Sequence, residues 1–375
     1  MSDYRLFTPG PVDVPDDVMQ SLTRPLVYHR RKEFAEIFNR VRQSLKQVLA
    51  TAGDIYLFGA SGTGAMEAAV ANLISPEEDV LVAVCGRFGE RWLDLCKRFK
   101  ARPQYLCVPY GESIPPARIE EALTTHPEIT TVFTTLTETS TGALMDIKAI
   151  GAITRRLNRI LVVDGVAGLA ADECYMDDWQ VDALVGASQK ALMAPPGVSF
   201  IALNGRAWER VLAARMPRFY FDLVACRKYG QDGQTPWTPP INIFVALDQS
   251  LGRITRMGME KVYEHHRTLA RILRDGIRRL GLDLFPKLPS NALTVAAIPK
   301  EYDGTKIVAY VLEKHNILFA NGQGEMRGRI VRIGHMGAYT EQDMHMAVEC
   351  FTRGCEAIGL EVNSKQTVDR VRKLL

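Results

Sequence analysis

The sequence predicts an α/β protein with a mostly parallel sheet that has helices on both faces, followed by a smaller α+β unit. Three observations support this fold class. Short apolar runs recur from residue 54 to residue 203 without polar alternation, which is typical of strands buried on both faces. Helical patterns separate these runs, as crossovers between parallel strands require. After residue 255, strand and helix patterns mix in a shorter segment.

The bulk composition is that of an ordinary globular protein with room for more than one domain. The chain has 375 residues, of which 47% are hydrophobic and 24% charged, and its net charge is +3. A length above that of one average domain favours two domains. The acidic and basic residues are interspersed, so the charge gives no support to a nucleic-acid partner.

Three further features bear on location and metal chemistry. The N-terminal residues 1–5 lack the apolar core of a signal peptide. No apolar run reaches the roughly 18 residues that a membrane helix needs, so we expect a cytoplasmic protein with no membrane partner. Seven cysteines without a Cys-x-x-Cys pair predict reduced, mostly buried thiols and no metal site.

The first fifteen residues are expected to form an extended N-terminal arm. They contain Thr8-Pro9-Gly10-Pro11 and a further proline, Pro15, which exclude a helix. From the residues alone, this arm can be either a disordered tail or a segment laid against another part of the molecule.

Residues 16–255 are expected to form the large domain. Asp16 or Asp17 can cap a short helix, and a longer helix is predicted from Lys32 because its apolar residues recur at helical spacing. Strands are predicted over residues 54–58, 79–85, 103–108, 130–135, 160–164, 183–186 and 199–203. Helical patterns between them include residues 68–73, 92–99, 119–123 and 147–157. This alternation is what predicts the parallel sheet.

Residues 256–375 are expected to form the smaller C-terminal domain. Helical patterns run from about residue 244 to about residue 280, with interruptions at Gly252 and Gly258. Strands are predicted over residues 294–298 and 330–333, and helices over residues 305–314 and 341–358. The glycine-rich stretch 321–328 is interpreted as a flexible loop.

Chemically capable side chains follow the predicted strands at their carboxyl ends, where parallel sheets bind ligands. Asp164 ends the strand 160–164, and Lys190 lies 26 residues later, just after the strand 183–186. That interval suits one strand–crossover–strand step, so both side chains can lie at neighbouring strand ends. A lysine in this place must be solvated, paired or neutral, and a partly desolvated amine can form a Schiff base with a carbonyl group.

Other residues at these strand ends match the needs of an aldehyde cofactor with a pyridine ring. Asp164 can keep the ring nitrogen protonated, which makes the ring an electron sink. The turn Ser61-Gly62-Thr63, at the start of a helix, can bind a phosphate through N–H groups and hydroxyls. Phe88 can stack on the ring. Each residue alone has a structural explanation, but their combination in this order favours a cofactor site.

With these residues in place, the sequence resembles the class V aminotransferases, within the alanine–glyoxylate and serine–pyruvate aminotransferase group, over nearly the whole chain. The matching motifs are Thr8-Pro9-Gly10-Pro11, Ser61-Gly62-Thr63-Gly64-Ala65-Met66-Glu67, Thr139-Ser140-Thr141-Gly142, Val163-Asp164-Gly165-Val166, Ser188-Gln189-Lys190-Ala191-Leu192, Pro195-Pro196-Gly197 and Arg332-Ile333-Gly334. The pairing of Ser-Gln-Lys with Pro-Pro-Gly is specific for this group.

The resemblance implies a fold type I large domain with pyridoxal 5′-phosphate (PLP) as the cofactor. It implies that Lys190 forms the Schiff base and moves the substrate proton, and that Asp164 pairs with the pyridine nitrogen. The cofactor contacts that it implies are Ser61, Gly62, Thr63 and Gln189 on the phosphate side, Phe88 on the ring face and Thr139 near the ring hydroxyl.

The resemblance also implies how substrate and subunits meet. It assigns Arg332 to the substrate carboxylate, a bidentate task that suits a guanidinium. It places Gly10 near the substrate, which makes the arm a lid. It implies a homodimer with shared active sites, in which Thr235 and Thr238 contact the cofactor phosphate of the other subunit.

The function implied by the resemblance is a transaminase that moves an amino group from a small amino acid, alanine or serine, to glyoxylate or pyruvate. Phosphonate-specific and ureido-amino-acid transaminases of the same fold remain alternatives. A cysteine desulfurase needs a nucleophilic cysteine on a small-domain loop, and residues 320–326 contain none. A dinucleotide-dependent oxidoreductase needs an acid after its second strand, where this chain has Cys85-Gly86-Arg87. A catalytically silent binding protein is expected to lack Lys190 or Asp164.

Overall fold

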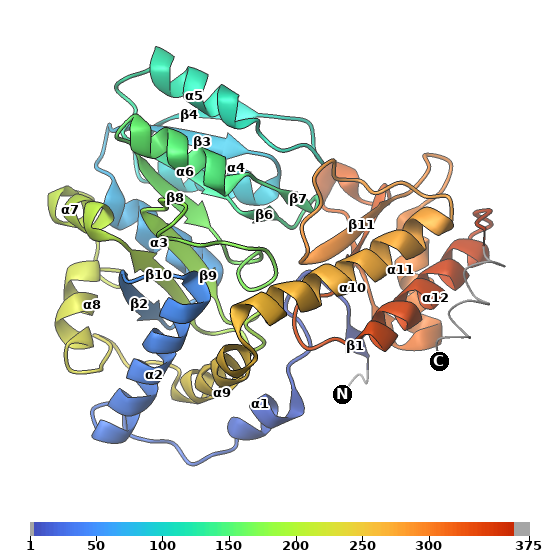
Figure 1. Ribbon diagram of the computed structural model, residues 1–375, viewed down its shortest axis with the longest axis horizontal. Helices are drawn as coiled ribbons and strands as arrows, with labels where there is room; N and C mark the ends of the chain where they lie inside the picture. Colours follow the sequence, from blue (N-terminus) through green and yellow to red (C-terminus); the bar gives the residue numbers. More distant parts are fainter. Residues whose placement is uncertain (1–3, 364–375) are drawn as a thin grey trace.

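The computed structural model describes residues 4–363, and a seven-stranded sheet lies at its centre (Figure 1). The strand order is β2 (Asp54–Phe58), β10 (Ser199–Leu203), β9 (Ala183–Ala187), β8 (Ile160–Asp164), β5 (Thr131–Thr135), β3 (Asp79–Val84) and β4 (Arg102–Cys107). The pairs from β9 to β4 are parallel, and β10 is antiparallel to both of its neighbours. The predicted α/β class with a mostly parallel sheet is confirmed.

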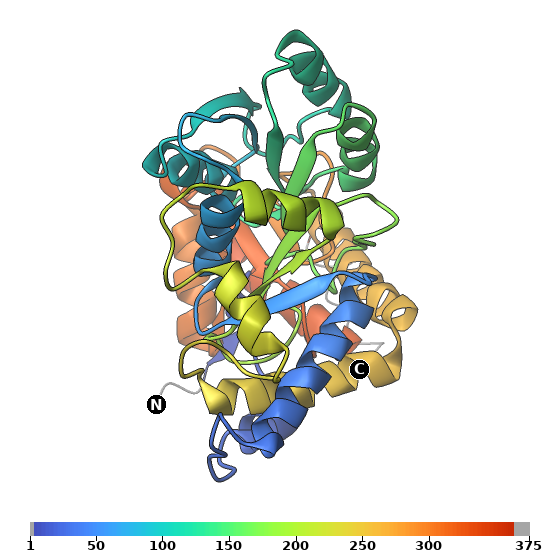
Figure 2. The ribbon, with the colours of Figure 1, turned by 90° about the vertical axis from the view of Figure 1, so that its left-hand side faces the viewer.

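Helices cover both faces of this sheet, as its apolar strands require (Figures 1 and 2). One face packs against α3 (Gly62–Leu73), α4 (Arg87–Arg98), α7 (Gly205–Ala213) and α8 (Leu223–Gly230). The other face packs against α2 (Lys32–Leu49), α5 (Pro116–Thr125), α6 (Ile147–Arg156) and α9 (Ile241–Met257). Neighbouring residues of one strand point to opposite faces of the sheet. Val82 of β3 packs in the core with α3 and α4, and Leu81 packs in the core with α2 and α9.

The C-terminal part of the chain forms a smaller α+β unit beside the large sheet (Figure 1). Its antiparallel sheet has the order β11 (Leu293–Ala297), β14 (Ile330–Gly334) and β13 (Ala320–Asn321). The helices α10 (Met259–Arg279), α11 (Gly304–His315) and α12 (Glu341–Ala357) share a separate core with it. Gly258, with φ +82°, separates α9 from α10 in a conformation that favours glycine. The expected boundary between residues 255 and 256 falls in the last turn of α9.

The N-terminal arm is laid against this smaller unit, which decides between the two alternatives for it. β1 (Arg5–Leu6) pairs in parallel with β12 (Ile317–Leu318). Phe7 is fully buried in the core of the smaller unit, and its ring centroid lies 4.8 Å from that of Tyr339. The N–H of Gly334 donates a hydrogen bond to the carbonyl oxygen of Phe7 over 2.7 Å. Backbone pairing and a buried ring therefore anchor the arm.

Two helix predictions are wrong in detail. Asp16 and Asp17 lie in the first turn of α1 (Asp16–Ser21), whose cap is Pro15, so neither carboxylate is the cap. Gly252 does not interrupt α9. A glycine inside a helix costs only about 1 kcal/mol relative to alanine, and the buried residues on either side of Gly252 hold the helix together.

Two regions expected to be turns or loops contain regular structure. The polar turn after β5 is a short hairpin of β6 (Thr137–Glu138) and β7 (Ala143–Leu144). The stretch 321–328 includes the end of β13 and a 3₁₀ turn, η1 (Gly324–Met326). Neither region has the apolar periodicity that local patterns detect, because each element is only two or three residues long.

Replacement of Phe7 with alanine is expected to destabilise the protein by about 3 kcal/mol, because it empties a buried aromatic site. Urea denaturation followed by circular dichroism measures the change in the free energy of unfolding. Tyr4→Ala is the control on the same arm, because Tyr4 is 37% exposed. The loss of the Tyr4 side chain is expected to change the free energy of unfolding by less than about 0.5 kcal/mol. Equal losses for the two variants would show that Phe7 does not anchor the arm.

Candidate active site

Lys190 lies at the carboxyl-end edge of the large sheet, in the turn that follows β9. Its Nζ donates a hydrogen bond to the carbonyl oxygen of Pro9 over 2.5 Å. Burial lowers the pKa of Lys190 to about 8. The charge of Asp164 opposes this shift, whereas the charges of Arg332 and Arg91 reinforce it. In a fraction of the molecules, this amine is therefore neutral near pH 7.

Asp164 ends β8, the strand beside β9, and its side chain is almost fully buried. The two strands are parallel, with Asp164 opposite Val185, so both end at the edge where Lys190 lies. Oδ1 of Asp164 accepts a hydrogen bond from the N–H of Val166 over 2.8 Å, and Oδ2 accepts none from the residues that the structure describes. Burial raises the pKa of Asp164 to about 6. The expected arrangement at neighbouring strand ends is thus found.

The turn at residues 61–63 lies against the segment that follows Asp164. Ser61 is the N-cap of α3, and its side chain makes no capping hydrogen bond. A Cβ atom at Gly62 would lie 2.8 Å from Cγ2 of Val166, so only glycine allows this close approach. The first N–H groups of a helix have no partner within it, and they attract anions. The start of α3 is therefore an anion-binding end placed beside the buried pair.

Arg91 is a site residue that the sequence patterns did not predict. It lies on α4, and its Nη1 donates to Oγ1 of Thr63 over 3.0 Å. Its guanidinium carbon also lies 4.7 Å from the centre of the Phe88 ring, in a cation–π contact. Its charge lowers the pKa of both Lys190 and Asp164. The sequence does contain one signal for Arg91, because it lies three positions after Phe88. Residues three apart on a helix share a face.

The side-chain oxygen of Gln189 lacks a hydrogen-bond partner among residues 4–363. This Oε1 atom is buried. Buried polar atoms are normally hydrogen-bonded, so an orphaned one indicates the place of a missing polar group. The carbonyl oxygen of Gln189 accepts the N–H of Val12 over 3.3 Å, which ties the arm to the same turn.

Arg332 reaches from β14 of the smaller unit to the hairpin of the large one and is 7% exposed. Nη1 donates to the carbonyl oxygen of Thr139 over 2.9 Å. Nε and Nη2 donate to the carbonyl oxygen of Asn321 over 2.9 and 2.7 Å. Burial lowers the pKa of Arg332 to about 10, so it stays cationic at pH 7. A guanidinium has five N–H groups, and two of those of Arg332 are left to donate to a further acceptor.

The arm passes directly over Lys190. Gly10 has φ +117°, and a Cβ atom there would lie 2.2 Å from Nζ of the lysine. The arm also touches the strand of Arg332, since a Cβ atom at Gly334 would lie 2.0 Å from the carbonyl oxygen of Thr8. Both close approaches require glycine. The arm thus joins the strand that carries Arg332 to the lysine.

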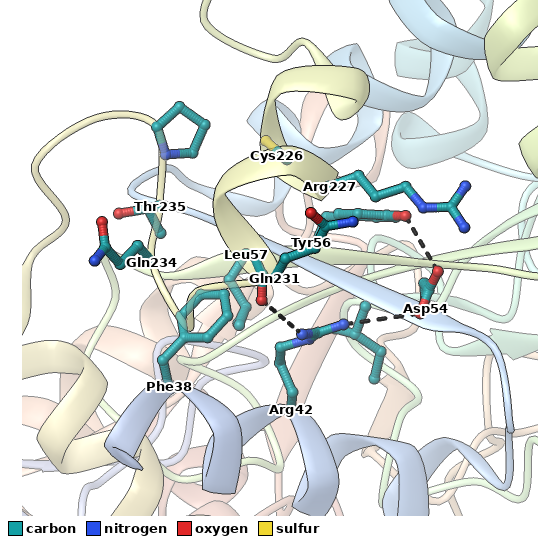
Figure 3. Close-up of a pocket in the computed structure, with 13 residues that line it drawn as sticks. Phe38, Arg42, Asp54, Tyr56, Leu57, Cys226, Arg227, Gln231, Gln234 and Thr235 are labelled. Atoms are coloured by element: carbon teal, nitrogen blue, oxygen red, sulfur yellow. Dashed lines mark hydrogen bonds and ion pairs between the residues drawn. The ribbon is translucent and has the colours of Figure 1, made fainter. Parts of the chain in front are cut away.

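Thr235 and Thr238 lie in the loop after α8, apart from these residues. Oγ1 of Thr235 donates to the carbonyl oxygen of Trp237 over 2.7 Å, and Thr238 is exposed. Thr235 lines a different cavity of about 220 Å³, where Arg42 is a neighbour (Figure 3). Within residues 4–363, neither threonine hydroxyl bonds to a side chain at the Lys190 site.

Glu138 is the second residue near the site that the sequence patterns missed. It ends β6, is fully buried and accepts hydrogen bonds from the N–H groups of Phe88 and Gly89. The sequence shows it only as part of a polar turn. Its partners on α4 lie about fifty positions earlier in the chain, where no local pattern connects them with it.

No group of three or more His, Cys, Asp or Glu side chains in residues 4–363 is arranged to hold a metal ion. Over the same span, no helix combines the length and the apolar character that crossing a membrane requires.

Comparisons with known proteins cover nearly the whole chain. The aminotransferase class-V family model matches residues 16–341. The L-aspartate–glyoxylate aminotransferase of Paracoccus denitrificans is 34% identical over 352 residues, which cover 91% of this chain and 88% of that protein. The serine–glyoxylate aminotransferase of Methylorubrum extorquens is 32% identical over 359 residues, which cover 92% of this chain and 89% of that protein.

A solved structure shows the same fold. The ureidoglycine–glyoxylate aminotransferase of Bacillus subtilis has a TM-score of 0.93 and 26% identity, over 99% of this chain and 97% of that one. The resemblance inferred from the motifs therefore agrees with the family match, with two relatives above 30% identity and with the fold. The chain belongs to the class V aminotransferase family.

Proposed function

We propose that this protein is a PLP-dependent transaminase. The observation that carries the proposal is a partly buried amine, Lys190, beside a buried carboxylate, Asp164, at the ends of two adjacent strands. Such a pair suits a cofactor that is held by a lysine and whose ring nitrogen is paired with an acid. Membership of the class V family supports the same cofactor.

The residues around the pair fit the phosphate of PLP. At the start of α3, Ser61, Gly62 and Thr63 offer N–H groups and hydroxyls to an anion. The amide of Gln189 can donate a further hydrogen bond through its NH₂ group. Arg91 adds a positive charge beside Thr63. These groups together complement a dianion.

The residues on the ring side fit as well. In this proposal Phe88 stacks on the pyridine ring and Thr139 approaches the ring hydroxyl. With a pKa of about 6, Asp164 is mostly ionised at pH 7, which suits a partner for a protonated ring nitrogen. When bound, PLP supplies an electron sink that weakens the bonds at the substrate Cα.

Lys190 has the properties needed to move the substrate proton. Because its pKa is about 8, Nζ can take up or release a proton close to neutral pH. We assign it the transfer of the proton at the substrate Cα. Arg332 holds the substrate carboxylate through its two remaining N–H groups. Gly10 and the rest of the arm cover the amine and exclude water.

Glyoxylate is the acceptor that the relatives favour. The two relatives and the solved structure named above differ in their amino donors, but each is named for glyoxylate. We propose a small donor, alanine or serine, with glyoxylate or pyruvate as acceptor. A ureido-amino-acid donor is the second candidate, because the solved structure at TM-score 0.93 carries that name.

We further propose a cytoplasmic homodimer with shared active sites. In this dimer Thr235 and Thr238 of one subunit contact the cofactor phosphate of the other. The surface beside their loop supports this, because Phe219 is 76% exposed and its ring lies 4.7 Å from that of Trp237. Exposed aromatic clusters are typical of interfaces. The seven free cysteines fit a reducing compartment.

The apo-protein is expected to gain a visible absorption band when PLP is added, and a true amino donor is expected to bleach it. Alanine, serine, aspartate and ureidoglycine are added one at a time with glyoxylate or pyruvate, and chromatography measures the products. Lys190→Ala is expected to lose the band and to lower the rate by about a thousandfold. Lys228→Ala, at an exposed position on α8, is the control. A band that survives Lys190→Ala unchanged contradicts the proposal.

Arg332→Ala is expected to raise the KM for the amino donor about ten- to a hundredfold, because charge-assisted hydrogen bonds to the carboxylate are lost. The dissociation constant of PLP is expected to stay near the wild-type value. Steady-state kinetics and a spectral titration measure the two quantities. Arg329→Ala is the control, because Arg329 is exposed and lies immediately before the same strand. Loss of PLP with an unchanged KM would place Arg332 on the cofactor instead.

The apo-protein is expected to become more stable as pH rises from about 8 to 10.5, because folding lowers the pKa of Lys190 from 10.5 to about 8. In that window the unfolded lysine keeps a proton that the folded one releases, so stability increases with pH. The gain relative to Lys190→Met, measured by urea denaturation across this range, is expected to approach about 3 kcal/mol. Parallel curves for the two proteins would show that the amine is not desolvated.

A further inference from the structure

The first turn of α4, which carries Phe88, is capped by a different part of the chain. Its N-cap residue is Gly86, which has no side chain to accept the free N–H groups of the helix. The N–H of Arg87 instead donates to Oγ of Ser140 over 3.2 Å. The N–H groups of Phe88 and Gly89 donate to Oε2 of Glu138 over 2.9 and 3.2 Å. The β6–β7 hairpin therefore caps this helix from outside.

The other oxygen of Glu138 fixes the hairpin itself. Oε1 accepts the N–H of Ser140 over 3.1 Å and its hydroxyl over 2.6 Å. The carboxyl group is 0% exposed, so its four donors come from the protein. Burial raises the pKa of Glu138, and the hydrogen bonds from Ser140, Gly89 and Phe88 lower it. One buried carboxylate thus ties the helix start and the hairpin turn together.

The absence of a side chain at residue 86 makes room for this contact. A Cβ atom at Gly86 would lie 2.5 Å from Oγ of Ser140 and 2.6 Å from both Cγ and Cδ of Glu138. A serine or aspartate at position 86 would be the usual cap, worth about 1 kcal/mol. Here residue 86 has no side chain, and the carboxylate of Glu138 binds the helix N–H groups instead. Burying a carboxylate is costly unless its oxygens are fully hydrogen-bonded. The need to cap α4 does not by itself explain why a carboxylate is buried here.

The two segments that Glu138 joins carry two of the residues assigned to ligand binding and contact a third. Phe88 sits in the capped turn of α4. Thr139 lies between Glu138 and Ser140, and its carbonyl oxygen accepts Nη1 of Arg332 over 2.9 Å. The ring that stacks on the cofactor, the hydroxyl that approaches it and the guanidinium for the substrate are therefore all placed by the same hairpin turn.

We infer that Glu138 is a positioning residue, which sets Phe88, Thr139 and Arg332 relative to Lys190 without touching cofactor or substrate. This inference rests on the proposed function, because it takes the ligand-binding roles of those residues from it. A glutamine at position 138 keeps one accepting oxygen, but its NH₂ group then meets two N–H donors or two Ser140 donors. The helix start or the hairpin turn must then shift.

Glu138→Gln is expected to raise the dissociation constant of PLP by about tenfold or more, measured by fluorescence titration of the apo-protein. The KM for the amino donor is expected to rise as well. Asp182→Asn is the matched control for the loss of a buried carboxylate. Asp182 is 0% exposed and accepts the N–H of Leu161, but it lies at the opposite, amino end of β9. It is expected to lower the melting temperature without changing the affinity for PLP.

A double-mutant cycle tests whether Glu138 acts through Phe88. In a Phe88→Ala background, Glu138→Gln is expected to change the affinity for PLP less than in the wild type. Additive effects, an unchanged dissociation constant in Glu138→Gln, or an equal change in Asp182→Asn would each overturn the inference. Ser140→Ala removes part of the same contact and replaces Glu138→Gln if that variant does not fold. A wild-type protein that binds no PLP overturns the proposed function instead, so the two failures are distinct.

Discussion

The site depends on the parallel pairing of β8 with β9 inside a sheet that is buried on both faces. That pairing brings Asp164 and Lys190 to one edge. Burial then shifts both groups toward neutral pH from opposite sides, since the pKa of Asp164 rises to about 6 and that of Lys190 falls to about 8. On an exposed surface each group would stay fully charged at pH 7. The same burial that stabilises the sheet therefore also lowers the pKa of the amine.

The single antiparallel strand, β10, contributes to this geometry through its direction. It runs opposite to β9 on one side and to β2 on the other, so β2 and β9 run the same way. The two reversals cancel, and the turn that follows β2 at residues 61–63 emerges at the same edge as Lys190. If β2 instead paired directly with β9 in the antiparallel direction, the turn after β2 would emerge at the opposite edge of the sheet.

Features with local causes could be predicted from the sequence, and features with distant causes could not. β8 and β10 have the predicted bounds, because each is a continuous apolar run between polar turns. Lys190 and Asp164 were found from their spacing and their places at strand ends. Arg91 and Glu138 were missed because their roles come from contacts with other elements. The docking of the arm pairs β1 with β12, which are far apart in the sequence. Neither segment shows a periodic pattern that indicates this pairing.

The anchoring of the arm has a consequence for the order in which the protein is completed during synthesis. Phe7 is synthesised well before β12, the strand that pairs with the arm, because β12 begins at Ile317. The strands of the large sheet lie between residues 54 and 203, so that sheet can form first. Lys190 therefore emerges long before the arm has anything to hold it in place. The arm can cover the lysine only after β12 has been made.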